Sequence, residues 1–437
     1  MEKAGAAATG AQPIKGAGWL VPFVVMLFFA WGFATVLIDT LIPKLKGLFA
    51  LSYAEVMLTQ FCFFLAYLIF SVPAGILLSR IGYVRGIVIG LIVMAGGCLL
   101  FAPAARMGVY PGFLAALFIM AAGITLLQVA ANPLMALLGK AETSHSRLNL
   151  AQAFNSLGTT VGPFVGSALI LAGGVATPDP TKLSPAALVA VRQAEAQSVQ
   201  LPFLGIAAGL IVLAAVFWMV RRSARFPSAD KPASLGSALG LLRHPHIAFG
   251  AMSIFLYVGA EVSIGSLMTN YLMQERTLGL AAAEAGKIVS LYWGGAMVGR
   301  FIGSVVLQKV RAGSVLAFCA FAAAALATTS GFSSGMLAAG AIVAIGLFNS
   351  VMFPTIFTVT IEGRGDDTPQ VSSLLCMAIV GGAIIPVITG ALADRVGLGL
   401  ALLAPVVCYV LIAMFGLSSR RRAVEMLDAP IAPPAGG

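Results

Sequence analysis

The chain of 437 residues is 59% hydrophobic and only 10% charged, with a mean hydropathy of +0.99 and a formal net charge of +10. A soluble protein has about a quarter charged residues, and its surface grows too fast with size to hide this much apolar side chain. The composition excludes a soluble enzyme and a disordered chain, and the net charge does not indicate nucleic-acid binding, which needs one clustered basic face.

Twelve apolar segments follow the N-terminal tail, and each has the roughly 20 residues that a helix needs to cross a bilayer. We expect these spans at 18–43, 52–78, 85–104, 111–138, 147–173, 201–220, 246–273, 284–308, 313–331, 335–360, 370–392 and 397–418. The prediction is an all-α membrane protein with twelve transmembrane helices.

The stretch 221–245, rich in Pro, Ser and Arg, predicts a linker between two six-helix bundles. The expected organisation is therefore a tail at 1–17, a bundle at 18–220, the linker at 221–245, a bundle at 246–418 and a tail at 419–437. An even number of spans puts both tails on one side. That side receives 17 of the 26 lysines and arginines and the other side 8, so the bias predicts a cytoplasmic linker and cytoplasmic tails.

The two predicted bundles carry prolines at matching positions. Pro133 and Pro354 are 221 residues apart, and Pro163 and Pro386 are 223 residues apart. The agreement of the two offsets indicates a duplication of six helices. Such duplications are typical of transporters whose halves move about a site near the membrane midplane.

Two acidic residues, Asp39 and Glu261, lie well inside apolar segments. A carboxylate in hydrocarbon is costly, so it faces a cavity or a partner, and a carboxyl that is alternately wet and enclosed suits a proton or cation carrier. We expect Asp39 and Glu261 to couple an ion; the alternative for Glu261 is a structural pair with Arg300. Arg300 itself, within GGAMVGRFIGS, is expected at a close helix contact, as a conformational latch.

Amide side chains form a second polar group within the spans. Gln128 and Asn132 are four residues apart on one helix face, and Asn149, Gln152 and Asn155 recur every three residues along another. Amides both donate and accept hydrogen bonds, which suits a polyhydroxylated ligand; the alternative is hydrogen bonding between helices. The expected substrate-binding residues are Gln128, Asn132, Gln152, Asn155, Glu261, Asn270, Trp293 and Asn349.

Six segments together resemble the fucose–galactose–glucose:proton symporter family of the major facilitator superfamily, in particular its bacterial glucose/galactose transporters. They are WGFATVLIDTLIPKLK, QVAANPLMALLG, RLNLAQAFNSLGT, GAEVSIGS, YWGGAMVGRFIGS and GLFNSVMFPTIF. The resemblance implies the major facilitator fold, with alternating access, and uptake of a monosaccharide across the inner membrane of a bacterium.

The resemblance also implies roles for single residues. Asp39 matches a carboxylate implicated in proton coupling, and Asn155 matches an amide implicated in the sugar site of the L-fucose branch. Gln128 stands where that branch has a glutamate, which leaves both a proton and sodium as the expected coupling ion. The superfamily's loop motif G-x-x-x-D-R-x-G is present at Gly75–Gly82 with Ser79 in place of the acid, and Arg80 is expected to act as a latch.

The function predicted from these observations is secondary active import of a glucose- or galactose-like hexose by symport with a proton or sodium. An enzyme would need an activated nucleophile or a metal site, and the residue pattern predicts neither, nor any cofactor or metal. The expected partners are the monosaccharide, the coupling ion and the bilayer, for a monomer without nucleic acid. The alternatives are export or exchange of another small solute by the same fold, and a sugar sensor that does not transport.

Overall fold

The computed structural model describes residues 18–49, 53–107, 110–166, 185–221, 234–280 and 282–428. Every regular element within these ranges is a helix. This follows from the apolar composition, because backbone polar groups in lipid need partners within the protein, and a helix supplies them within its own segment.

The first half of the chain forms six long helices. They are α1 (Val21–Phe49), α2 (Tyr53–Ile81), α3 (Tyr83–Met107), α4 (Tyr110–Leu137), α5 (Ser144–Gly166) and α6 (Pro185–Val220). The second half consists of α8 (Pro245–Met273), α9 (Ala282–Val306), α10 (Ala312–Phe332), α11 (Gly335–Asn349), α12 (Met352–Ile361), α13 (Thr368–Met377), α14 (Gly381–Val396), α15 (Leu398–Ala401) and α16 (Leu403–Asp428).

Eleven stretches of the described chain are long and apolar enough to cross a membrane. Helix α5 is not among them, because the amides along it lower its hydropathy. It nevertheless lies within the first bundle, packed along α1. With α5 included, the expectation of twelve membrane helices is confirmed.

Two of the expected spans are broken rather than continuous. The span expected at 335–360 is divided into α11 and α12, and the next is divided into α13 and α14 by a 3-10 turn at Ala378–Val380. Pro354 explains the first break, since it has no N–H to donate to the carbonyl of Ser350 one turn earlier. Arg300 Nε donates to that carbonyl instead, at 3.1 Å.

The structure also differs from the expected connections. Helix α6 begins at Pro185, well before the span expected at 201–220, because PAALVAVRQAEAQ is made of good helix formers. The linker contains a short helix, α7 (Leu235–Gly240), capped by the Ser234 hydroxyl, which accepts from the backbone N–H of Ser237. Helix α16 continues to Asp428, beyond the end of the span expected at 397–418.

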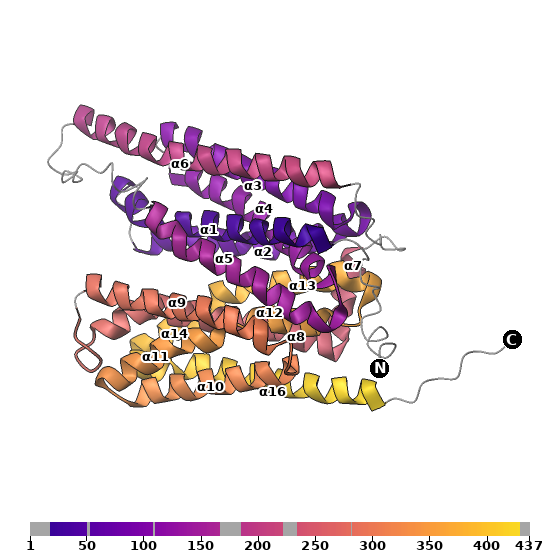
Figure 1. The fold of residues 1–437 in the computed structure, drawn as a ribbon. Helices are drawn as coiled ribbons and strands as arrows, with labels where there is room; N and C mark the ends of the chain where they lie inside the picture. Colours follow the sequence, from indigo (N-terminus) through magenta and orange to yellow (C-terminus); the bar gives the residue numbers. More distant parts are fainter. Residues whose placement is uncertain are drawn as a thin grey trace.

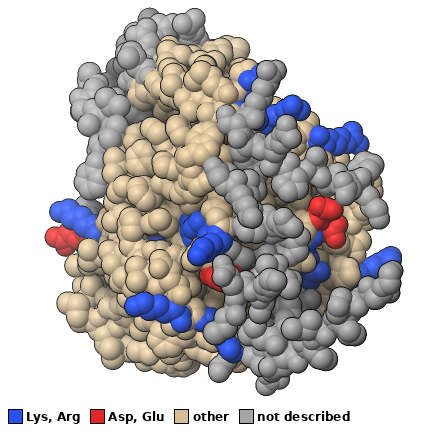
Figure 2. All heavy atoms as spheres, turned by 45° about the vertical axis from the view of Figure 1, so that its right-hand side comes forward, with Lys and Arg blue, Asp and Glu red and all other residues tan. Residues whose placement is uncertain are grey.

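Figure 1 shows the two halves as separate helical bundles lying against each other, with the start of α1 and the end of α16 at the same end of the molecule. We call this the basic end. Figure 2 shows its lysines and arginines. Those with described side chains are Arg80, Arg85, Lys140, Arg147, Arg221, Arg243, Lys309, Arg311 and Arg364, whereas the opposite end has Arg276, Lys287 and Arg395.

Candidate functional site

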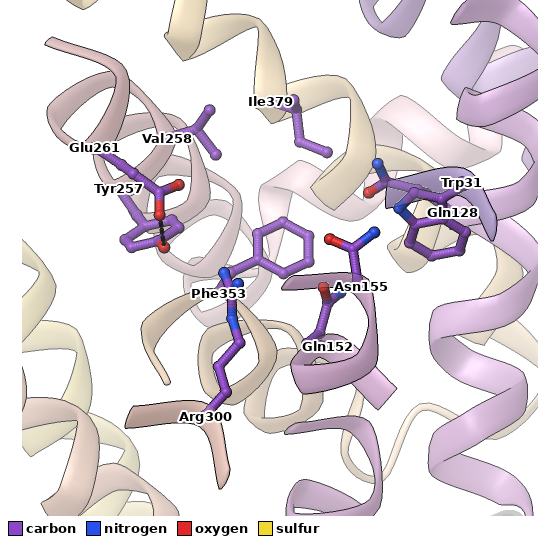
Figure 3. A pocket seen from close by; sticks show the side chains of 10 residues that line it. All are labelled: Trp31, Gln128, Gln152, Asn155, Tyr257, Val258, Glu261, Arg300, Phe353 and Ile379. Atoms are coloured by element: carbon purple, nitrogen blue, oxygen red, sulfur yellow. Dashed lines mark hydrogen bonds between the residues drawn. The ribbon is translucent and has the colours of Figure 1, made fainter. Parts of the chain in front are cut away.

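A cavity of about 150 Å³ lies between the two halves. Both bundles contribute side chains to it, as Figure 3 shows. The lining residues are Trp31, Gln128, Gln152, Asn155, Tyr257, Val258, Glu261, Arg300, Phe353 and Ile379. The volume suits one small polar molecule rather than a drug-sized ligand.

The wall from the first half is made of amides beside an indole ring. Gln128 comes from α4, Gln152 and Asn155 come from α5, and Trp31 comes from α1. The amides of Gln152 and Asn155 lie on one face of α5, as their three-residue spacing predicted. This wall is neutral and rich in hydrogen-bonding groups.

The wall from the second half carries the charges. The Tyr257 hydroxyl donates to Glu261 Oε1 at 2.7 Å, one turn along α8. Arg300 of α9 donates to the carbonyl of Ser350 at 3.1 Å, and also to the hydroxyl of Ser156 in the other half. Glu261 lines the cavity, as expected of a binding or coupling residue, and Arg300 lines the same cavity. The hydrogen bond that Glu261 accepts comes from Tyr257.

Four of the expected binding residues lie away from the cavity lining. Asn132 is buried and accepts from Gln152 Nε2 at 3.4 Å, and Asn349 is buried and donates to the Tyr292 hydroxyl at 2.8 Å. Asn270 is exposed near the end of α8. Trp293 is 43% exposed.

The residues predicted as latches and as ion-coupling groups lie in different parts of the molecule. Arg80 is exposed at the end of α2, at the basic end. Arg300 lines the cavity and joins the two halves. Asp39 belongs to α1, but its side chain lies outside the described residues.

The sequence prediction missed several lining residues, among them Tyr257, Val258, Phe353 and Ile379. Tyr257 had a detectable signal, because it precedes Glu261 by one helical turn and faces the same way. Phe353 follows directly after the break between α11 and α12, which the sequence did not predict. Val258 and Ile379 are aliphatic residues in aliphatic segments, so nothing in the sequence distinguishes them as residues of a binding site.

Between the cavity and the basic end, the halves are joined by hydrogen bonds. Three of them come from the first turns of α5: Asn149 Nδ2 donates to the Arg300 carbonyl at 2.5 Å, Ser146 donates to the Ser304 carbonyl at 2.6 Å, and His145 Nδ1 lies 2.5 Å from the Thr358 hydroxyl. These contacts close the cavity toward the basic end.

A further contact between the halves depends on a proline of the predicted duplication. Pro133 in α4 has no N–H for the carbonyl of Val129, four residues earlier. Ser372 of α13, in the other half, donates to that carbonyl at 2.9 Å. The proline thus leaves a buried acceptor that the opposite bundle satisfies.

The arrangement is suited to holding a polyhydroxylated molecule. Amides, a carboxylate and an arginine provide hydrogen-bonding partners, and the rings of Trp31 and Phe353 provide apolar surface for C–H groups. Within the part of the chain that the structure describes, no group of three or more His, Cys, Asp or Glu side chains is placed to hold a metal ion.

The chain is similar to known membrane transporters over nearly its whole length. The family model described as Major Facilitator Superfamily matches residues 23–375. The glucose/galactose transporter of Brucella abortus is 49% identical over 404 residues, covering 92% of this chain and 94% of that protein. The L-fucose-proton symporter of Escherichia coli is 34% identical over 411 residues, covering 91% of this chain and 92% of that protein.

The fold is similar to that of a solved transporter as well. A crystal structure of the major facilitator transporter FucP in the outward conformation has a TM-score of 0.84 to this chain at 33% sequence identity. The match covers 92% of this chain and 99% of that one.

Proposed function

This chain belongs to the major facilitator superfamily, and from that premise we propose that it imports a hexose by symport with a proton. The relatives named above are a glucose/galactose transporter and an L-fucose-proton symporter. Glucose and galactose are the proposed substrates because the glucose/galactose transporter shares 49% of its residues with this chain.

One observation of the site supports the proposal most directly. The cavity between the halves places three amides opposite the Glu261 carboxylate, with aromatic rings beside them. A small polyol needs many hydrogen-bonding partners and some apolar surface, and this lining offers both. An exporter of apolar solutes would be expected to have a mainly apolar cavity, so the lining favours a sugar.

The proposed coupling residues are Asp39 and Glu261. An ionised carboxylate facing a closed, dry cavity is unfavourable. Binding of a proton neutralises it and lowers the barrier to the movement of the halves, so sugar and proton cross together.

The proposed orientation has the basic end in the cytoplasm. Lysines and arginines gather in cytoplasmic loops of membrane proteins, and they gather here at the end where α1 begins and α16 ends. We place a monomer in the bacterial inner membrane, with both tails in the cytoplasm and its apolar outer faces against lipid. No catalytic activity is part of the proposal.

Uptake of labelled hexose into proteoliposomes, with proton and sodium gradients imposed separately, tests the function. We expect accumulation of glucose or galactose when the outside is acidic, with competition by unlabelled hexoses. Accumulation driven only by sodium would replace the proton as the coupling ion. Absence of hexose uptake under both gradients would contradict the function itself.

The binding site is tested by replacing Asn155 with alanine. Loss of one hydrogen bond is worth roughly 0.5–1.5 kcal/mol, so calorimetry should show hexose affinity lowered about two- to twelvefold. Asn270→Ala is the matched control, because Asn270 is an exposed amide outside the cavity lining. Equal affinities of the two variants would remove Asn155 from the site.

The coupling role is tested by Asp39→Asn, which imitates the neutral carboxyl. We expect the variant to lose accumulation against a gradient while retaining sugar exchange between equal pools, where no proton needs to leave. Intact accumulation would show that the coupling carboxylate lies elsewhere.

A further inference from the structure

Two further amides lie one layer below the cavity lining, toward the basic end. Asn132 follows Gln128 by four residues along α4, which runs toward the basic end, and Asn149 precedes Gln152 by three residues along α5, which begins there. Each spacing is about one helical turn, or roughly 5 Å along the helix axis. Gln128 and Gln152 line the cavity, whereas Asn132 and Asn149 lie outside its lining and are fully buried.

Each amide of this lower layer has one arm without a hydrogen-bond partner among the described residues. Asn132 Oδ1 accepts from Gln152 Nε2 at 3.4 Å, but Asn132 Nδ2 has no partner. Asn149 Nδ2 donates to the Arg300 carbonyl at 2.5 Å, but Asn149 Oδ1 has no partner. A buried polar atom without a partner is costly. The layer therefore holds one donor and one acceptor that the closed basic end does not use.

Opening of the basic end brings this layer onto the path of a departing ligand. Asn149 faces the other half, because its Nδ2 lies 3.0 Å from the position of a Cβ on Gly303 of α9. When the halves separate at that end, Asn149 loses the Arg300 carbonyl and its whole amide becomes free. A ligand that leaves Gln152 for the basic end then meets Asn149 and Asn132 one turn further on.

We propose that Asn132 and Asn149 form a second hexose-binding site, the exit site, which holds the sugar after the basic end opens and before it enters the cytoplasm. The inference rests on the proposed function and adds a step to it. Asn132 Nδ2 supplies a donor, and the freed amide of Asn149 supplies a donor and an acceptor. Sugar hydroxyls both donate and accept, so a hexose can pass from one layer of amides to the next without losing all its hydrogen bonds at once.

The alternative is that Asn149 only holds the basic end closed. The two roles have opposite effects on binding from the cytoplasmic face. Loss of a closing hydrogen bond increases the population of the open state, and therefore raises the apparent affinity for sugar at that face. Loss of an amide that binds the sugar lowers this affinity.

The test compares Asn149→Ala with Ser146→Ala. Ser146 is the matched control, because it also donates across the halves near the basic end, to the Ser304 carbonyl at 2.6 Å, but has no amide. The measurement is the concentration of glucose or galactose that half-saturates exchange, in right-side-out vesicles and in everted vesicles, which expose the cytoplasmic face. In everted vesicles, this concentration should be about two- to twelvefold higher for Asn149→Ala than for Ser146→Ala, the value of one hydrogen bond. In right-side-out vesicles the two variants should agree.

Asn132→Ala tests the exit site from the other helix. The hydrogen bond that Asn132 makes to Gln152 lies within the first half, so its loss leaves the contacts between the halves in place. The half-saturating concentration should rise about two- to twelvefold more in everted than in right-side-out vesicles. An equal rise at both faces would mean that Asn132 acts only through Gln152 in the central cavity, and would overturn its place in the exit site.

The remaining outcomes separate the exit site from the proposed function. If Asn149→Ala and Ser146→Ala agree at the cytoplasmic face while wild-type protein exchanges hexoses, Asn149 only closes the basic end, and the exit site is wrong although the proposed function stands. Absence of hexose exchange by wild-type protein would contradict both.

Deoxy hexoses on wild-type protein decide the matter if the variants do not fold. With an exit site, at least one hydroxyl should contribute about two- to twelvefold more to half-saturation at the cytoplasmic face than at the outer face. Identical contributions of every hydroxyl at the two faces would overturn the proposal.

Discussion

Two segments at opposite ends of the molecule share one sequence motif but differ in their contacts with the other half. Gly75–Gly82 ends α2 at the basic end, and Gly390–Gly397 ends α14 at the opposite end; both follow G-x-x-x-[S/D]-R-x-G. Both close the helix with a glycine of positive φ, +79° at Gly82 and +84° at Gly397. In each, the N–H of that glycine donates to the carbonyl four residues earlier, at 2.8 and 2.9 Å.

The first glycine of each motif has a different environment. A Cβ on Gly75 would lie 2.6 Å from Ser373 Cβ and 2.9 Å from the Pro369 carbonyl, both on α13 in the other half. A Cβ on Gly390 would have no atom of the described residues within 4 Å. Among the described residues, the first glycine of the motif therefore contacts the other half at the basic end and has no such contact at the opposite end.

This difference indicates how the halves move. Transporters of this architecture expose one central site alternately to the two sides of the membrane. In the proposed orientation, a closed basic end leaves the site facing outward, and the similar transporter was solved in its outward conformation. We infer that the surface around Gly390 meets the first half when the opposite end closes.

The largest expected effect comes from filling the unengaged glycine. Gly390→Trp should block closure of the opposite end, so hexose still binds from outside while turnover in proteoliposomes is lost. The control is Gly205→Trp on α6, where a Cβ also has no described atom within 4 Å and the helix packs mainly on α3. Normal turnover of Gly390→Trp would show that this surface stays open throughout the cycle.

Filling the engaged glycine should have the opposite effect. Gly75→Leu overpacks the contact with α13, at a typical cost of about 1–3 kcal/mol, and thus disfavours the closed basic end about 5- to 150-fold. Labelling of a cysteine introduced on the cytoplasmic side of the cavity should increase. Unchanged labelling, with wild-type thermal stability, would mean that the contact between Gly75 and α13 does not stabilise the closed basic end.

The pH of the cytoplasmic side should also act on closure of the basic end. Burial, and secondarily the charge of Arg147, lower the pKa of His145 to about 4 from its usual 6.5. His145 touches Thr358 across the halves. The closed basic end therefore favours the neutral form of His145. Above pH 6.5 His145 is neutral in both the open and the closed state, and closure has its full stability. As the pH falls from 6.5 toward 4, protonation of His145 in the open state makes closure progressively less stable.

Between pH 6.5 and 4, the equilibrium constant for closure of the basic end should fall by up to about tenfold per pH unit, since one unit of pKa shift equals about 1.36 kcal/mol. Cysteine labelling of the cavity from the cytoplasmic side, followed across pH 4 to 7, measures it. His145→Gln should flatten the profile between those limits. A wild-type profile in this variant would assign the pH dependence to another group.

The smallest expected effect concerns the carbonyl that Pro133 leaves free. Ser372→Ala removes the donor to Val129 across the halves and should weaken closure of the basic end about two- to twelvefold, the value of one hydrogen bond. Ser253→Ala is its control, because that buried hydroxyl donates to Phe249 within its own helix, at 2.7 Å. Equal labelling of both variants would show that the contact does not contribute.

The class of the molecule and several of its buried polar residues could be predicted from the amino-acid sequence. Apolar segments of sufficient length must become helices in a bilayer, so the twelve helices followed from composition and length. The three-residue spacing put Gln152 and Asn155 on one face of α5, and the cost of a buried charge marked Glu261 as facing a cavity or a partner. The matched positions of Pro133 and Pro354 indicated two halves.

Which polar residues meet in the cavity could not be predicted, because it depends on how the helices pack. A membrane helix is apolar toward lipid and apolar toward its neighbours, so its sequence does not reveal which face points inward. For that reason Asn270 and Trp293 were expected in the site but are exposed, while Tyr257 and Phe353 line it. The contact of Arg300 with the other half depends on how the two bundles are placed against each other, which no local pattern specifies. The same holds for the lack of a described neighbour within 4 Å of a Cβ at Gly390.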